Sequence, residues 1–177
     1  MSGRAAFHST VLALSFVSGA SHVFAGADKQ VEFFIGTCLH SIDDISRVKS
    51  LAAIKKWQKL PEDTLNVMKP VEGRDYEGWA VKYDSELYIV AVNRGVWGEG
   101  EQANTCTVIV NAPKDEVLAA LGKAVKLKKV HVEDEPLQVS EVFQFDSLIA
   151  DRAIVQVMWA KNLKPPVNLS IVGITKK

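Results

Sequence analysis

Two cysteines, Cys38 and Cys106, set the strongest constraint on how this 177-residue chain can fold. They are the only cysteines in the sequence, and they lie far apart. In an oxidising compartment such a pair most simply forms one disulfide, and the alternative is two independent buried thiols. A bond that closes so long a loop would stabilise the fold by on the order of 4 kcal/mol in the chain-entropy description. The pairing therefore depends on the compartment to which the chain is delivered.

The N-terminal residues 1–27 have the pattern of a cleavable secretory signal. Arg4 supplies a positive n-region, residues 5–24 contain no charged side chain, and 11–17 form the most apolar stretch. Ala25-Gly26-Ala27 is an A-x-A cleavage pattern, and cleavage after Ala20 is the alternative. A buried helix would need a clearer apolar stripe, and a retained anchor would need about 20 strongly apolar residues. We therefore expect export to the periplasm or secretion, with no stable membrane anchor after cleavage.

The remaining residues, 28–177, are expected to form a single domain with one disulfide. Without Arg4 they contain 20 lysines and arginines (21 minus one) against 21 aspartates and glutamates. A nucleic-acid-binding protein usually has a basic excess on one face, so this balance argues against nucleic acid as a partner.

The elements of the first half follow from changes in hydrophobic period and from turn residues. The apolar run 30–40 is expected to start a helix or to form a buried turn, and Pro61 is expected to end the helix that follows. Asp84-Ser85-Glu86 predicts a turn between two strands, of which the second is expected to be buried on both faces. The expected elements are a helix capped by Ser41 that runs to about Leu60, a short helix over 62–68, and strands over 79–83 and 87–92.

The second half is expected to be rich in strands. Residues 93–105 include three glycines and are expected to form a flexible loop before a strand over 106–110. Pro113 and the acidic pair after it predict a helix that ends no later than Val125. The remaining expected strands are 130–133, 139–146, 153–159 and 169–174. Short turns between sequential strands predict an α+β fold, with an antiparallel sheet of about six or seven strands and two main helices packed against it.

Few residues of the expected domain suit catalysis. Only His40 and His131 remain after cleavage, and Cys38-x-His40 is a weak nucleophile–base pair because residues two apart seldom face each other in a helix. Zinc bound by both cysteines and both histidines would lack the closely spaced ligand pairs of recognisable sites. The sequence therefore predicts no catalytic residue, metal or cofactor.

The glycine-rich loop is the candidate for contact with a partner. Its acidic residues and the strand that follows argue against phosphate binding. One interpretation is a plain hairpin connection; the other is a recognition loop in which a tryptophan anchors a partner protein. The partner-binding residues predicted on that second interpretation are Arg94, Val96, Trp97, Glu99 and Glu101.

Lysines at positions 123, 126, 128 and 129 form a local basic patch. A solvated helix end followed by edge-strand lysines that discourage aggregation explains it. Attraction to an anionic envelope polymer or an acidic partner face is the functional alternative.

A set of short motifs resembles a family of small, uncharacterised periplasmic proteins of Gram-negative bacteria. They are the apolar run ending in Cys38-Leu39, the basic segment ending in Trp57-Gln58-Lys59-Leu60-Pro61, Gly78-Trp79-Ala80-Val81, and Cys106-Thr107-Val108-Ile109-Val110. The resemblance covers residues 31–125 and implies a periplasmic location, but it implies no activity and no functional residue.

Together these features predict an exported, non-enzymatic protein that binds another envelope or secreted protein. It could serve as a cell-envelope accessory or as an immunity-type inhibitor that covers another protein's site. The alternatives are a small envelope hydrolase, in which a histidine would meet a Ser, Cys or carboxylate in a cleft, and a carrier of small apolar ligands, which would need an enclosed cavity of about 300 Å³ or more.

Overall fold

The structure, a computed structural model, describes residues 26–68, 74–97, 101–146, 152–162 and 167–175. Residues 1–25 of the signal segment predicted over 1–27 lie outside these residues, whereas its last residue, Ala27, is buried at the start of the first helix. Four α-helices and one 3₁₀ helix (η1) are present in the described part of the chain. They are α1 (Ala27–Thr37), η1 (Leu39–Ser41), α2 (Ser46–Ile54), α3 (Glu62–Met68) and α4 (Lys114–Ala124).

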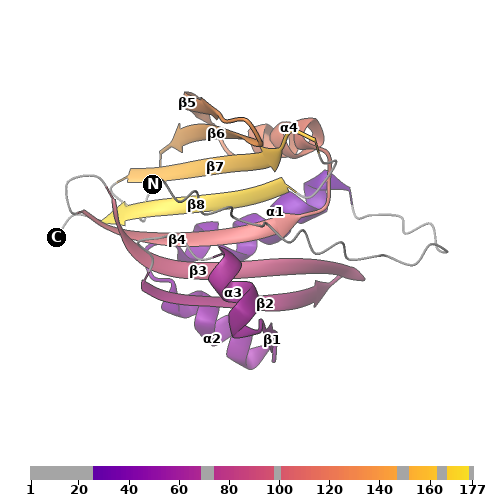
Figure 1. Cartoon of the computed structure of the whole chain (residues 1–177), viewed down its shortest axis with the longest axis vertical. Coiled ribbons are helices and arrows are strands. Elements are labelled where there is room, and N and C mark those ends of the chain that lie inside the picture. The colour runs from indigo at the N-terminus through magenta and orange to yellow at the C-terminus, as the bar shows by residue number, and fades with distance from the viewer. Residues whose placement is uncertain (1–25, 69–73, 98–100, 147–151, 163–166, 176–177) are drawn as a thin grey trace, which may run out of the picture.

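The described strands form one antiparallel sheet in the order β1-β2-β3-β4-β8-β7-β6-β5 (Figure 1). The predicted α+β class and antiparallel sheet are confirmed, while the predicted counts are too low, because the sheet has eight strands. The additional strand is a two-residue edge strand, and α1 is a further full helix. The strands are β1 (Gln58–Lys59), β2 (Arg74–Tyr83), β3 (Glu86–Trp97), β4 (Glu101–Val110), β5 (Lys128–Asp134), β6 (Gln138–Phe145), β7 (Arg152–Ala160) and β8 (Val167–Thr175).

Helices α1, α2 and α4 cover one face of the sheet, and α3 lies on the other face beside β2 and β3 (Figure 1). We call the first the disulfide face, because Cys106 of β4 points to it, and the second the opposite face. The face of every other strand residue follows from alternation, since successive side chains of a strand point to opposite faces. The buried side chains of the disulfide face include Val90, Val108, Leu169 and Val157, which lie in register across four strands.

An aromatic cluster fills the disulfide face at the β2–β3 end of the sheet. Phe33 of α1 stacks on Tyr88 with 4.4 Å between ring centroids, and it lies 5.1 Å from Tyr83. Trp57 extends the cluster, 6.4 Å from Phe33 and 6.4 Å from Trp79. The cluster packs the first helix onto the first hairpin.

The helix predicted to run from Ser41 to about Leu60 ends earlier than expected, at Ile54. Lys56 adopts a left-handed conformation (φ 54°), and two backbone bonds close the helix end: Lys56 N–H donates to Ala53 O (3.2 Å), and Trp57 N–H donates to Ala52 O (2.9 Å). This is the Schellman arrangement, which usually contains glycine at the position of Lys56. The prediction was wrong because no glycine marks the stop.

The flexible loop predicted over 93–105 is also wrong for the described residues. Backbone pairing continues from Asn93↔Thr105 to Trp97↔Glu101, so that only residues 98–100 lie outside the described hairpin. Gly95 is paired with Ala103 inside the ladder, where a glycine is tolerated. The expectation that 87–92 is buried on both faces fails at Leu87, which is 67% exposed.

Candidate interaction surface

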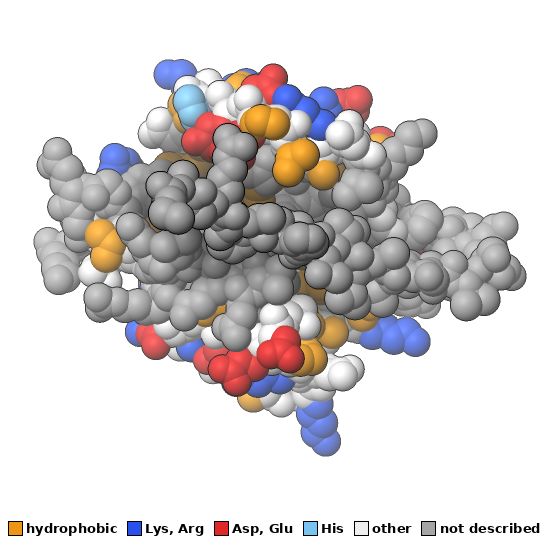
Figure 2. All heavy atoms as spheres, in the orientation of Figure 1, with side chains coloured by type: hydrophobic (Ala, Val, Ile, Leu, Met, Phe, Trp, Pro, Cys, Tyr) orange, Lys and Arg blue, Asp and Glu red, His pale blue; other side chains and the backbone are white. Residues whose placement is uncertain are grey.

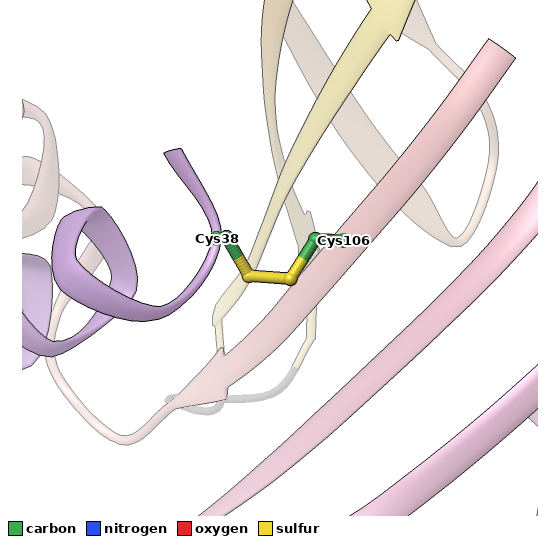
Figure 3. The surroundings of a disulfide bond; sticks show 2 residues. All are labelled: Cys38 and Cys106. Carbon is green, nitrogen blue, oxygen red and sulfur yellow. A yellow bond between two sulfur atoms is a disulfide. The ribbon is translucent and has the colours of Figure 1, made fainter. Parts of the chain in front are cut away.

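The predicted disulfide is present and lies in the core. Cys38 caps the end of α1, and its sulfur is bonded to that of Cys106 in the middle of β4 (Figure 3). The Cα atoms are 5.4 Å apart, and both residues are fully buried. Because both sulfurs are in the bond, the nucleophile and the zinc site considered from the sequence would each lack a free thiolate.

Two further contacts hold the segment after Cys38 against the sheet. The Asn104 side chain of β4 donates to Ile42 O (3.1 Å) and Asp43 O (2.9 Å). Gly173 of β8 allows the same segment to approach closely, since a Cβ there would meet Ile42 Cγ1 at 2.5 Å and Ile42 O at 3.0 Å. The segment between η1 and α2 is thereby fixed over β4 and β8.

Charged side chains surround this segment. Asp44 accepts hydrogen bonds from Ser46 N–H (3.0 Å) and Ser46 Oγ (2.7 Å), and these bonds lower the pKa of its carboxyl group. Arg47 forms an ion pair with Asp43 (3.0 Å) and donates to His40 O (3.3 Å). An ordered, polar rim results at the start of α2.

The β3–β4 hairpin continues past this rim on the same face. Arg94 and Val96 have the alternation of Val90 and therefore point to the disulfide face, where both are exposed. Arg94 lies 3.9 Å from Asp75, which has a left-handed backbone (φ 52°) at the irregular start of β2. Val96 is 43% exposed, so an apolar side chain lies beside charged ones.

The structure divides the predicted partner-binding residues between the two faces. Glu101 forms an ion pair with Arg152 of β7 on the opposite face, away from Arg94 and Val96. Trp97 pairs with Glu101 through the backbone, but its side chain lies outside the described residues, as does Glu99. The residues brought together on the disulfide face are Arg94 and Val96, with Asp75 and Asn104 as neighbours that the sequence did not suggest.

Among the described residues, neither His40 nor His131 meets a Ser, Cys or carboxylate in the arrangement expected of a hydrolase. His40 is exposed. His131 is also exposed, and its Nε2 lies 3.6 Å from Glu133 Oε1, beyond hydrogen-bond distance, on a strand that is exposed throughout. Within the described ranges, no group of three or more His, Cys, Asp or Glu side chains is placed to hold a metal ion.

A groove lies between α1 and α4, with a volume of about 250 Å³. It is lined by Val31, Ile35 and Ala120 and edged by the ion pair of Asp28 with Lys123 (3.2 Å). The groove is open to solvent and smaller than the enclosed cavity that an apolar-ligand carrier would need.

No helix in the described part of the chain combines the length and the apolar composition needed to cross a membrane. Comparisons of the chain with protein-family models, with curated proteins and with solved structures gave no match in any of the three.

Proposed function

We propose that the chain is exported and acts in the periplasm or outside the cell as a non-enzymatic protein that binds another envelope or secreted protein. The buried Cys38–Cys106 bond supports export, because disulfides persist in oxidising compartments. If the signal is cleaved as proposed, N-terminal sequencing of the exported protein will find Asp28 or Ser21 as the first residue.

The binding surface that we propose is the hairpin end formed by Arg94, Val96 and Asp75. The observation that supports it most is the exposure of Val96 beside a charged pair, 43% of its surface being accessible on a long strand that stays paired with β4 to its end. Interfaces commonly combine an apolar centre with a polar rim, and arginine is enriched in them. The neighbouring segment is held by Asn104 and the disulfide, so that ordering it would cost little entropy on binding.

The test is capture of a partner from the native envelope fraction by the immobilised, oxidised protein. The double variant Arg94→Glu/Val96→Asp should reduce the captured amount at least tenfold, since it reverses a charge and places a carboxylate on the apolar centre. Leu87→Asp is the matched control, because Leu87 is an exposed residue at the other end of the same strand. Equal capture by both variants would show that the hairpin end is not the surface.

A further inference from the structure

The edge strand β5 is a long strand that is exposed along its whole length. It is last in the strand order and pairs with β6 on one side only, and all seven of its residues are exposed. Val130 and Val132 are 48% and 46% exposed. Unpaired N–H and C=O groups along such an edge are a template for another strand. Figure 2 shows acidic, basic and apolar side chains mixed at this end of the molecule.

Natural sheets protect their edges with charges and bulges, and β5 has both. Its register with β6 shifts between Lys129 and His131, so that Val130 is the additional residue of a bulge. Lys129 is turned back to its own chain, where its Nζ lies 2.5 Å from Glu141 and 5.6 Å from the centre of the Phe143 ring. The other charges of β5 therefore decide which strands can pair with its free edge, because they repel some sequences and attract others.

The register with β6 shows which face each side chain of β5 occupies. Lys128, His131 and Glu133 lie opposite Gln144, Val142 and Ser140, on the opposite face of the sheet. Val132 and Asp134 lie opposite Glu141 and Val139, on the disulfide face. The bulge thus places three polar residues in one row, with the imidazole between a lysine and a glutamate.

We propose that β5 pairs with β5 of a second copy of this chain, antiparallel and about a two-fold axis at His131. In this register His131 meets its own copy, Lys128 lies opposite the glutamate at position 133 of the second copy, and Val132 lies opposite the bulge at Val130. Opposing residues then share a face, as an antiparallel ladder requires. The dimer would contain one sheet that is continuous across the two copies.

Charge complementarity selects a second copy and this register. An axis placed at Lys128, Glu133 or Asp134 would bring a like charge against itself, which destabilises a cross-strand pair. An axis at Val132 avoids that repulsion but gives Lys128 no partner within the strand. Among the described ion pairs, Lys128 has none in its own chain, whereas Asp134 is paired with Lys161. The axis at His131 provides Lys128 with a carboxylate and preserves the pairs that already exist.

The proposal is independent of the proposed function, because it uses none of the residues of the β3–β4 hairpin end. Loss of the envelope partner on mutation of Arg94 would leave the dimer intact, and loss of the dimer would leave capture of that partner unchanged. The two can therefore fail separately.

Sedimentation equilibrium of the purified, oxidised protein tests the dimer. We expect a dissociation constant on the order of 10 μM, typical of a small interface. Val132→Lys should raise it at least tenfold, while Leu87→Lys, an equally drastic change at an exposed position on another strand, should leave it within twofold. A wild-type protein that stays monomeric at 500 μM (about fifty times that constant), or equal effects of the two variants, would overturn the proposal.

A charge-reversal pair tests the register. Lys128→Glu and Glu133→Lys should each weaken the dimer about tenfold, since each converts two attractive pairs into two repulsive ones. An equimolar mixture of the two variants should associate as tightly as the wild type, because in the mixed dimer both pairs are again opposite in charge. Failure of the mixture to recover would reject the pairing, and the recovery controls for any effect of either change on folding.

Cross-linking tests the position of the axis. Because both native cysteines are bonded, His131→Cys introduces the only free thiol, and it should form an intermolecular disulfide on mild oxidation. Opposed residues of an antiparallel pair have Cα atoms about 4.5–5.5 Å apart, which a disulfide can bridge. The control is Glu133→Cys, whose copy would lie roughly 13 Å away along the strands. Self-cross-linking of Val132→Cys in preference to His131→Cys would also contradict the proposal.

Discussion

The two edges of the sheet are built in opposite ways. At one edge, β1 has only two residues, and the bond from Leu60 N–H to Gly78 O (2.9 Å) follows it in the same register. Leu65 of α3 packs over Gly78, where a Cβ would meet its Cδ2 at 2.7 Å. At the other edge, β5 offers seven exposed residues. We call the first, where α3 and the aromatic cluster pack against the sheet, the closed end, and the second, where β5 pairs with β6 on one side only, the open edge.

The side chains that pack beneath the two edges also differ, and more of them lie beneath the closed end. Behind β2, Glu77 is bound by Lys49 (2.6 Å) and Lys59 (3.5 Å), and the aromatic cluster fills the space under Trp79. Beneath β5, Lys129 covers the ring of Phe143, and no described residue of the strand is buried. Packing therefore stabilises the closed end, whereas the open edge is where we propose that two copies of the chain associate.

Removal of the disulfide should have the largest effect on the closed end. The bond joins residues 68 positions apart, and the double variant Cys38→Ala/Cys106→Ala should lose about 4 kcal/mol of unfolding free energy. Urea unfolding followed by tryptophan fluorescence measures the change. A loss below about 1 kcal/mol would mean that packing alone holds α1 on β4.

Gly173→Ala should cost about 2–3 kcal/mol, because the new methyl group would collide with the backbone and the side chain of Ile42. Gly122→Ala is the matched control. Gly122 lies in α4 with nothing within 4 Å of an added Cβ, so the same change should stabilise the protein by about 0.5–1 kcal/mol. Thermal unfolding of the two variants should shift in opposite directions, and equal shifts would show that the segment after η1 is not tightly packed on β8.

Alkaline pH should weaken the aromatic cluster. Burial, together with the charges of Glu86 and Asp84, raises the pKa of Tyr88 to about 12 from its ordinary 10.0. The unfolded chain therefore loses this proton first, so unfolding free energy falls between about pH 10 and pH 12, by roughly 2 kcal/mol. Tyr88→Phe should remove this part of the pH dependence. It should not destabilise the protein at pH 7, because no described residue is a hydrogen-bond partner of the buried hydroxyl. An unchanged alkaline slope would contradict the assignment.

Glycine at two left-handed positions should stabilise the closed end slightly. Lys56 (φ 54°) ends α2, and Ser85 (φ 69°) follows Asp84 (φ 48°) in the two-residue turn between β2 and β3. Both torsions suit glycine better than a residue with a Cβ, so Lys56→Gly and Ser85→Gly should each add about 0.5–1 kcal/mol in urea unfolding. Ser50→Gly, an exposed position inside α2, should instead destabilise by about 0.5 kcal/mol.

The smallest effect is expected at the open edge. Val130→Thr should change the unfolding free energy of the monomer by less than about 0.5 kcal/mol, because the side chain is already half exposed. Val90→Thr, in the fully buried row of β3, should cost more than about 1.5 kcal/mol. Both are measured at protein concentrations below 1 μM (well under the dimer constant expected above), and equal losses would remove the distinction between the two ends.

The sequence was informative where local chemistry decides the structure. Asp84 and Ser85 predicted the first hairpin, Pro113 predicted the start of α4, and the cysteine pair predicted its bond. The sequence was misleading at Lys56, where the backbone adopts a left-handed conformation that glycine usually occupies. It could not predict that β4 would pair with β8, because this contact depends on the packing of the whole sheet and has no local signature. The sequence could not place Arg94 and Val96 on one face, because it predicted a loop from residue 93. The structure places them there because β3 continues to Trp97 and its side chains alternate from Val90 onward.

The pairing of β4 with β8 has a consequence for the order in which the protein can be completed. Strand β8 follows the other described strands along the sequence but lies in the middle of the sheet, so it joins the block β1–β4 to the block β5–β7. A chain that crosses a membrane from its N-terminus would deliver both cysteines well before β8. The disulfide would then form before β8 is in place, and the two blocks would be joined only when β8 pairs with β4 and β7. Folding would be slow by its topology, since its central contacts join distant parts of the chain.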